Sequence, residues 1–175
     1  MDIELVNVVA GGSLDIEIDL HSAFEQIGAS NAKYEPEIAP GLQLQLKGAT
    51  IMLFHSGEYH LTGADSFENA QEAARKLTEV LEKMLEEEVQ QEHFEIRNLL
   101  YKGEFGVELD LEELHSDLPG KTEHHPENHP ALYFRSDTHE GLLILFRTGK
   151  YTVTGITNDR AVEQLVGEFM YETEI

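Results

Sequence analysis

The sequence contains no cysteine, few basic residues and no long apolar run. Without cysteine, the chain can form no disulfide bond, thiol nucleophile or zinc–thiolate site. Its apolar runs are only a few residues long, so we expect no membrane-spanning helix, and the N-terminus shows no export leader. These absences predict a cytoplasmic protein that does not bind membranes.

Basic residues are strongly outnumbered. The 175 residues include 34 Asp+Glu and only 12 Lys+Arg, which gives a formal net charge of −22. This charge argues against a partner that is itself a polyanion, such as nucleic acid or an acidic membrane. The chain is nevertheless 41% hydrophobic, enough for a core, and its length suits one domain or two small halves.

Five short motifs occur twice, in the same order and 90–92 residues apart. Ordered recurrence of this kind indicates a tandem duplication, with a first copy at residues 1–91 and a second at 92–175. The paired motifs are Asn7-Val8-Val9 with Asn98-Leu99-Leu100, Asp19-Leu20 with Asp110-Leu111, Pro36-Glu37 with Pro126-Glu127, Phe54-His55-Ser56-Gly57 with Phe146-Arg147-Thr148-Gly149, and Leu61-Thr62-Gly63 with Val153-Thr154-Gly155.

Alternating apolar residues predict four strands in each copy, at 3–10, 42–47, 50–55 and 58–63, and at 94–101, 131–136, 142–146 and 150–155. Ser56-Gly57 and Thr148-Gly149 stand where tight hairpin turns are needed. In the stretch 42–46 leucine alternates with glutamine, so one sheet face is apolar and the other polar. We expect helices to bury the apolar face and leave the other as a binding surface.

Each copy also predicts two helices. Short helices begin near Asp19 and Asp110, where an aspartate can cap free N–H groups. Helical spacing of apolar residues predicts a long helix at 66–90 and a shorter one at 158–171. Asp65, three residues before Glu68, fits a capping box with aspartate as the cap. Strands with helices on one side give an α+β fold.

The duplicated motifs, each copy closed by a helix, resemble those of the archaeal and eukaryotic TATA-box-binding protein family over nearly the whole chain. The resemblance implies a pseudo-twofold saddle, in which a curved ten-stranded antiparallel sheet carries helices on its convex face. It further implies a general transcription initiation factor of the archaeal nucleoid. In this family the concave sheet binds the minor groove of DNA, and phenylalanine wedges kink the duplex.

The resemblance also implies roles for individual residues. Asparagine side chains would reach base edges, threonines would flank them, and apolar side chains would lie against sugars and bases. One phenylalanine per copy would act as a wedge, two basic residues would contact phosphate, and one loop glutamate would contact the B-type general transcription factor. The asparagines are Asn7 and Asn98, and the threonines are Thr62 and Thr154. The apolar residues are Val9, Leu100, Met52 and Ile144, and the wedges are Phe54 and Phe146. The basic residues are Arg135 and Lys150, and the loop glutamate is Glu127. Family members can also self-associate through the saddle, so a homodimer is a further expectation.

Several positions depart from the family pattern. A second wedge phenylalanine is replaced by Ala39 and His129, a first-copy arginine by Gln45, and a first-copy lysine by Glu58; His60 replaces a valine. A glutamate in place of lysine repels phosphate and removes a counterion-release contribution to DNA binding. The alternative function is therefore a divergent saddle-fold paralogue with lost or weakened TATA binding, acting as a protein-interaction or regulatory module.

Simpler interpretations accompany each assignment. The asparagines could be ordinary polar strand residues, the phenylalanines core residues, and the basic residues solvated charges that discourage edge pairing. A group of histidines beside Glu127 lacks a regular metal-binding spacing and fits a polar loop better than a zinc site; it comprises His124, His125, His129 and His139. We find no catalytic constellation and no cofactor motif, and so expect no enzyme.

Three hypotheses can reconcile the charge of −22 with a DNA-binding fold. The protein could come from a salt-loving archaeon, because molar salt shortens the Debye length to a few ångströms. The acidic residues could instead lie on the helices and leave the sheet neutral. The third hypothesis is the divergent paralogue.

Overall fold

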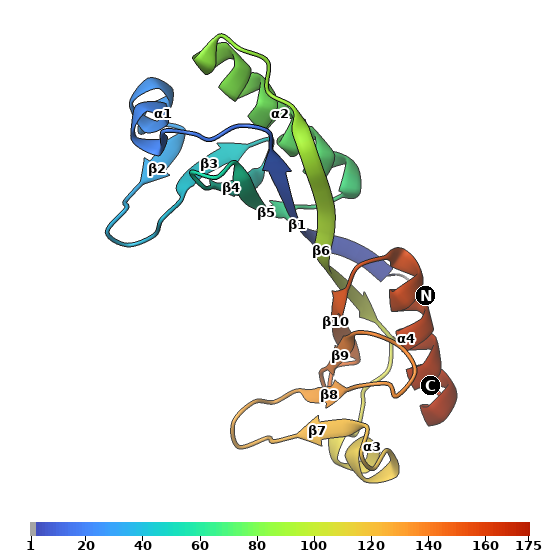
Figure 1. Ribbon diagram of the computed structural model, residues 1–175. Helices are drawn as coiled ribbons and strands as arrows, with labels where there is room; N and C mark the ends of the chain where they lie inside the picture. Colours follow the sequence, from blue (N-terminus) through green and yellow to red (C-terminus); the bar gives the residue numbers. More distant parts are fainter. Residues whose placement is uncertain (1–2) are drawn as a thin grey trace. The chain divides into compact units, whose positions relative to one another are not determined.

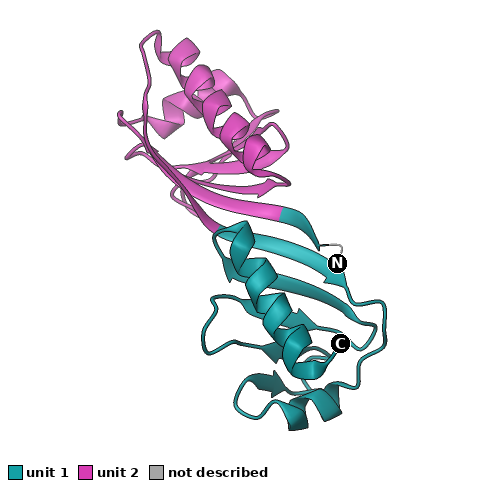
Figure 2. Cartoon of the chain, turned by 90° about the vertical axis from the view of Figure 1, so that its right-hand side faces the viewer, with its two compact units in different colours: residues 1–6, 98–175 teal, residues 7–97 magenta. Residues whose placement is uncertain are grey.

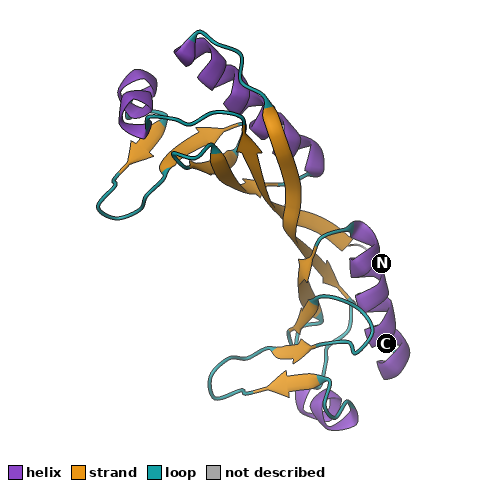
Figure 3. Ribbon diagram, in the orientation of Figure 1, coloured by secondary structure: helices purple, strands orange, loops and turns teal. Residues whose placement is uncertain are grey.

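The computed structural model describes residues 3–175 as an α+β fold of ten strands and four helices within that range (Figures 1 and 3). The described chain divides into two compact units, shown in Figure 2: unit 2 comprises residues 7–97, and unit 1 comprises residues 3–6 and 98–175. Unit 2 thus holds most of the first sequence copy and unit 1 most of the second. The unit boundaries differ by several residues from the 91/92 division that the sequence period indicates.

Both copies have the same element order. The elements are β1 (Ile3–Leu14), α1 (Leu20–Ile27), β2 (Ala32–Tyr34), β3 (Leu42–Leu46), β4 (Ala49–Leu53), β5 (Glu58–Ala64), α2 (Phe67–Leu85), β6 (Gln91–Glu104), α3 (Leu111–Asp117), β7 (Thr122–His124), β8 (Leu132–Phe134), β9 (Leu142–Leu145), β10 (Lys150–Ile156) and α4 (Asp159–Thr173). The strands are hydrogen-bonded in the order β2-β3-β4-β5-β1-β6-β10-β9-β8-β7. Strands β2 and β7 were not predicted from alternation, because three residues are too few to show a period.

The predicted helix starts are confirmed, with one correction. Asp19 and Asp110 cap α1 and α3 by accepting hydrogen bonds from backbone N–H groups of the first turn. The capping-box prediction for α2 is wrong: the cap is Ser66, whose hydroxyl accepts from the Asn69 N–H at 3.1 Å. This helix also ends at Leu85 instead of residue 90, because Glu86 adopts a left-handed conformation with φ of 56°.

The helices cover one face of the strands in each unit (Figure 2). In unit 2 one side of α2 is fully or almost fully buried, with Ala73, Leu77 and Leu81 among its residues, as are Ile51 and Leu61 of the strands. The predicted burial of the leucine-rich face is therefore confirmed. Within residues 3–175, no helix is long and apolar enough to cross a bilayer.

A tyrosine and a glycine interlock at corresponding places in the two units. Tyr59 is fully buried, and a side chain at Gly12, its partner in register, would overlap the Tyr59 ring. Tyr151 and Gly103 form the equivalent pair in unit 1. Each glycine is therefore required by the close approach of a ring to the backbone.

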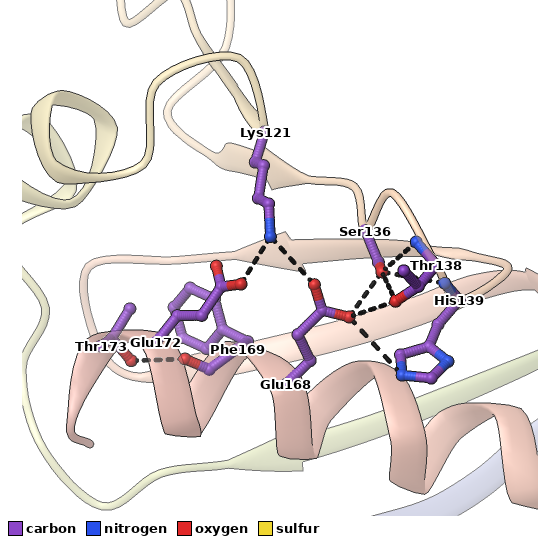
Figure 4. A network of polar contacts seen from close by, with 8 residues as sticks. All are labelled: Lys121, Ser136, Thr138, His139, Glu168, Phe169, Glu172 and Thr173. Carbon is purple, nitrogen blue, oxygen red and sulfur yellow. Dashed lines mark hydrogen bonds and ion pairs between the residues drawn. The ribbon is translucent and has the colours of Figure 1, made fainter.

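An ionic network joins α4 to the loops of unit 1 (Figure 4). Lys121 Nζ lies 3.1 Å from Glu168 Oε1 and also donates to Glu172, while Ser136 donates to the second Glu168 oxygen. Burial raises the pKa of Glu168, but hydrogen bonds from Ser136 and Lys121 outweigh burial and hold that pKa below its usual value. The same contacts with Glu172 and Glu168 raise the pKa of Lys121. The network therefore fixes the end of α4 against the strands.

Candidate nucleic-acid interface

Within residues 3–175, each unit has a sheet face that no helix covers (Figure 1), which we call the open face. In unit 2 a row across the strands runs through positions paired in register, namely Lys33, Gln43, Met52, His60 and Gly11. The equivalent row in unit 1 is Glu123, Tyr133, Ile144, Thr152 and Lys102. The predicted apolar contact residues Met52 and Ile144 are therefore half-buried at the same position of the two faces.

Beside this row the sheet contains a β-bulge in each unit. Val8 pairs with Ala64 and Ala10 with Leu61, so two residues, Thr62 and Gly63, stand opposite Val9 alone. In unit 1 the same register shift sets Thr154 and Gly155 opposite Leu100. A bulge leaves a backbone N–H without its ladder partner and commonly uses a glycine at positive φ. Gly63 and Gly155 have φ of 87° and 75°.

The two predicted asparagines satisfy these bulges. Asn7 Oδ1 accepts a hydrogen bond from the Gly63 N–H at 2.8 Å, and Asn98 Oδ1 accepts from the Gly155 N–H at 2.7 Å. A backbone N–H can only donate, so the atom that faces it is the amide oxygen and the orientation of each amide is fixed. Asn98 Nδ2 also lies 3.0 Å from Thr154 Oγ1. Each amide therefore presents its NH₂ group as the donor side, and in Asn98 one of the two N–H groups donates to Thr154.

The phenylalanine of the first copy packs against a histidine that sequence reasoning had counted only as a departure. The Phe54 ring is half-buried beside the hairpin turn, and its centroid lies 5.2 Å from that of His60 at an interplanar angle of 71°. This edge-to-face geometry is a favourable aromatic arrangement. His60 therefore supplies an aromatic contact to Phe54, while Ala39 supplies no ring.

The second phenylalanine also has a histidine neighbour, but from a different element. The His129 ring lies 6.4 Å from Phe146 and 5.8 Å from Tyr133. His129 Nδ1 accepts a hydrogen bond from the Ala131 N–H at 3.2 Å, which holds the imidazole in the loop before β8. The substituted wedge position of the second copy thus retains an aromatic contact with Phe146.

The predicted phosphate-contacting residues are exposed. Arg135 follows buried Phe134 and so alternates onto the open face, and Lys150 pairs in register with Glu104. In the first copy Gln45 Nε2 instead donates to Thr50 Oγ1 at 2.8 Å, and Glu58 is exposed opposite Ser13. Lys102 pairs with Thr152 in the row above, with Nζ 2.9 Å from Glu4 Oε2. A hollow in this face is lined by residues that include Phe146, Lys150, Thr152 and Lys102.

Arg97 is a further cation near the open face that sequence reasoning missed. Its guanidinium lies directly against Gly11, where a Cβ of residue 11 would stand. The Arg97 Nε is 3.3 Å from Glu95 Oε1. Hydrogen bonds from His93 and Arg97 hold the pKa of Glu95 below its usual value. The sequence shows only that Gly11 and Lys102 each follow an asparagine by four residues, and it carries no signal for the Arg97 contact.

The loop that holds Glu127 is exposed, and His125 Nδ1 lies 3.7 Å from a Glu127 oxygen. Of the other histidines named with Glu127 in the sequence, His129 lies in the same loop and His124 donates to the Ala131 carbonyl, whereas His139 contacts Glu168 elsewhere in unit 1. Within residues 3–175, no group of three histidine or carboxylate side chains is arranged to hold a metal ion.

Comparisons with known proteins agree with these features. The family model described as "Transcription factor TFIID (or TATA-binding protein, TBP)" matches residues 2–84 and 93–172. The TATA-box-binding protein of Methanocaldococcus jannaschii is 29% identical over 171 residues, 97% of this chain and 92% of that protein. The protein of the same name from Methanococcus aeolicus is 33% identical over 159 residues, 90% of this chain and 86% of that protein.

A solved structure extends the agreement to the fold. The structure of Methanococcus jannaschii TBP is 25% identical in sequence, covers 100% of both chains and superposes with a TM-score of 0.83. The α+β fold of two repeats that the resemblance implied is therefore confirmed. The matching family is one of transcription factors and not of enzymes. With the family model matched in both repeats and archaeal relatives aligned over nearly the whole length, the chain belongs to the TATA-binding protein family.

Proposed function

We propose that this protein is an archaeal transcription initiation factor that binds the minor groove of TATA-like DNA through the open faces of both units. The observation that carries the proposal is the repeated asparagine–glycine contact at the two bulges. Because each Oδ1 is bonded to a glycine N–H, Asn7 and Asn98 offer donors to a ligand. The minor groove of A·T pairs presents acceptors only, so donors suit it.

The surrounding side chains support the same ligand. Thr62 and Thr154 lie in the same bulges as the glycines, and Val9 and Leu100 stand opposite them. Phe54 and Phe146 each follow the strand beside a hairpin turn, the position at which an apolar wedge can enter a base step. Arg135 and Lys150 supply positive charge for phosphates.

An equilibrium binding experiment tests the proposal. A fluorescently labelled TATA duplex and a scrambled duplex of equal composition are titrated with protein from 0.05 M to molar KCl, with donor–acceptor labels at the duplex ends to report bending. We expect preference for the TATA duplex with bending. Equal binding of both duplexes, or none at any salt concentration, would contradict it.

The alternative function is a paralogue that binds a protein and has little affinity for TATA DNA. The observation that favours it is the first-copy face, where Glu58 is exposed and Gln45 is engaged with Thr50. A pull-down with immobilised protein tests it. Recovery of a basic protein with no retained DNA supports the alternative, and TATA binding that depends on Asn98 contradicts it.

Two partner proposals follow from the family. The exposed Glu127 loop is proposed to contact the B-type general transcription factor. A Glu127→Arg substitution should weaken the ternary complex in a gel shift without changing binary DNA binding.

The second proposed partner is another copy of this chain, which would form a homodimer through the open faces. Sedimentation velocity in the presence and absence of duplex tests it, because DNA and a second copy would compete for the same face.

A further inference from the structure

Two cations occupy corresponding places on the open faces of the two units. Gly11 and Lys102 are equivalent positions, since each lies four residues after its asparagine and pairs with an equivalent residue, His60 or Thr152. Residues directly opposite in an antiparallel pair have side chains on the same face. Exposed His60 alternates with buried Tyr59 and Leu61, so position 11 points to the open face.

The side chain missing at Gly11 is replaced by another residue's cation. The Arg97 guanidinium lies where the Cβ of a larger residue at position 11 would be. It covers the backbone of Gly11, which is therefore buried. In unit 1 the same position is filled by the lysine of Lys102 itself, which alternates with buried Tyr101. A positive charge therefore lies at position 11 of the first open face and at the equivalent position 102 of the second. Arg97 supplies the first charge from a neighbouring strand, and Lys102 supplies the second itself.

Each cation is accompanied by one glutamate. Arg97 lies 3.3 Å from Glu95, and Lys102 lies 2.9 Å from Glu4. All four side chains are 44–66% exposed, so both pairs are surface pairs that hold weakly. A phosphate can therefore take the place of the carboxylate as the partner of the cation.

We propose that Arg97 and Lys102 are a matched pair of phosphate-contacting residues, and that Glu95 and Glu4 restrain them until a polyanion binds. This inference rests on the proposed DNA-binding function. It adds one cation to each open face, including that of the first copy, whose family lysine is replaced by Glu58. A phosphate contact carries no base information, so these residues set affinity and salt dependence without sequence preference.

The test measures the salt dependence of binding for Arg97→Gln and Lys102→Gln with the TATA and scrambled duplexes. Each lost phosphate contact lowers the slope of log K against log[salt] by about 0.9. We expect this decrease for each variant, and an equal weakening on both duplexes. Arg160→Gln, an exposed position in the first turn of α4, makes the same change in net charge and should leave the slope unchanged.

The glutamates give an opposite test. Glu95→Gln and Glu4→Gln should strengthen binding several-fold at low salt, whereas Glu87→Gln, exposed beyond α2, should strengthen it less. Thermal unfolding of every variant shows that it is folded. Wild-type slopes in both cation variants, or an equal fall in Arg160→Gln, would overturn this inference while leaving the proposed function intact. If the wild-type protein binds no duplex, the proposed function fails and this inference fails with it.

Discussion

The orientation of single side chains determines what each open face can recognise. Asn7 and Asn98 would be ambiguous on a flat strand, because an amide can present either its oxygen or its nitrogen. The bulge glycines remove the ambiguity, since their N–H groups take the oxygens at 2.8 Å and 2.7 Å. Recognition by these residues therefore depends on a backbone irregularity one strand away.

A conservative substitution can separate this role from folding. In Asn98→Asp a carboxylate oxygen still accepts from the Gly155 N–H, but the amide donors are lost. We expect near wild-type thermal stability and a loss of about 1–3 kcal/mol in TATA-duplex binding, measured by fluorescence anisotropy. Asn158→Asp is the matched control, because Asn158 caps α4 and aspartate caps equally well. Comparable weakening of duplex binding in both variants would show that the added negative charge, and not the loss of the Asn98 donors, lowers the affinity.

A charge reversal at residue 58 tests whether the first-copy open face contacts phosphate. Glu58 is exposed on β5, where Lys150 is its equivalent in the second copy. Glu58→Lys should strengthen duplex binding at low salt and raise the salt slope by about 0.9, because one phosphate contact is gained. Glu87→Lys, with the same change in net charge, is the control. An unchanged slope in Glu58→Lys would place this residue outside the DNA contact.

The interlocked tyrosines and glycines hold the long strands β1 and β6 against their neighbouring strands β5 and β10. The Tyr151 ring lies against the backbone of Gly103, its partner in register. Gly103 cannot be replaced by alanine without moving Tyr151, because the added methyl group would overlap the tyrosine ring.

Two glycine substitutions in unit 1 should therefore have opposite signs. Gly103→Ala should lower the free energy of unfolding by about 1–3 kcal/mol, because the tyrosine must move. Gly167→Ala should raise it by about 0.5–1 kcal/mol, because Gly167 is in the interior of α4 and, among the described residues, no side chain or strand lies within 4 Å of its added Cβ. Urea denaturation measures both. Destabilisation by both substitutions would contradict the packing described for α4.

The Lys121 network predicts how the docking of α4 depends on pH. The pKa of Glu168 is lowered in the folded chain, so its contribution is fully present above the ordinary glutamate pKa of about 4.3 and is lost as the pH falls through the lower folded value. The stability difference between wild type and Glu168→Gln should accordingly shrink from pH 7 to pH 3. Glu163→Gln, exposed on the same helix, should show no such trend. A difference that grows on acidification would reverse the assigned direction.

Much of the architecture could be predicted from local pattern. Alternation and glycine turns identified the hairpins of Phe54 and Phe146, because period and turn chemistry are encoded in neighbouring residues. Local pattern also predicted Asp65, and not Ser66, as the cap of α2, since aspartate and serine are equally good N-cap residues and stand next to each other in the sequence. The Thr-Gly repeat was visible, but its bulge was not, because a bulge is a property of two paired strands. The contact of Arg97 with Gly11 joins residues far apart in sequence and leaves no local trace.

For the whole molecule, the net charge matters less than its placement. Residues 7–97 contain 17 acidic and 6 basic residues, and the remainder of the chain contains the same numbers. The two halves therefore do not differ in total charge. They differ in which positions of the open face carry it, as Glu58 and Lys150 illustrate.

A charge of −22 on one chain should also make folding depend on salt. Repulsion among carboxylates opposes the compact state, and the Debye length falls from about 10 Å at 0.1 M to about 3 Å at 1 M. We expect Tm to rise between 0.1 M and 1 M KCl, as measured by circular dichroism. Sucrose at matched osmolality is the control for exclusion effects. A flat or falling Tm would argue against adaptation to high salt.

The different boundaries of the sequence copies and the compact units have a consequence for dividing the chain. Residues 92–97 follow the period of the second copy but pack in unit 2, and the start of β1 belongs to the first copy but packs in unit 1. Each half thus borrows a strand end from the other. A chain cut between residues 91 and 92 would therefore lose, from each compact unit, a strand end that packs in it.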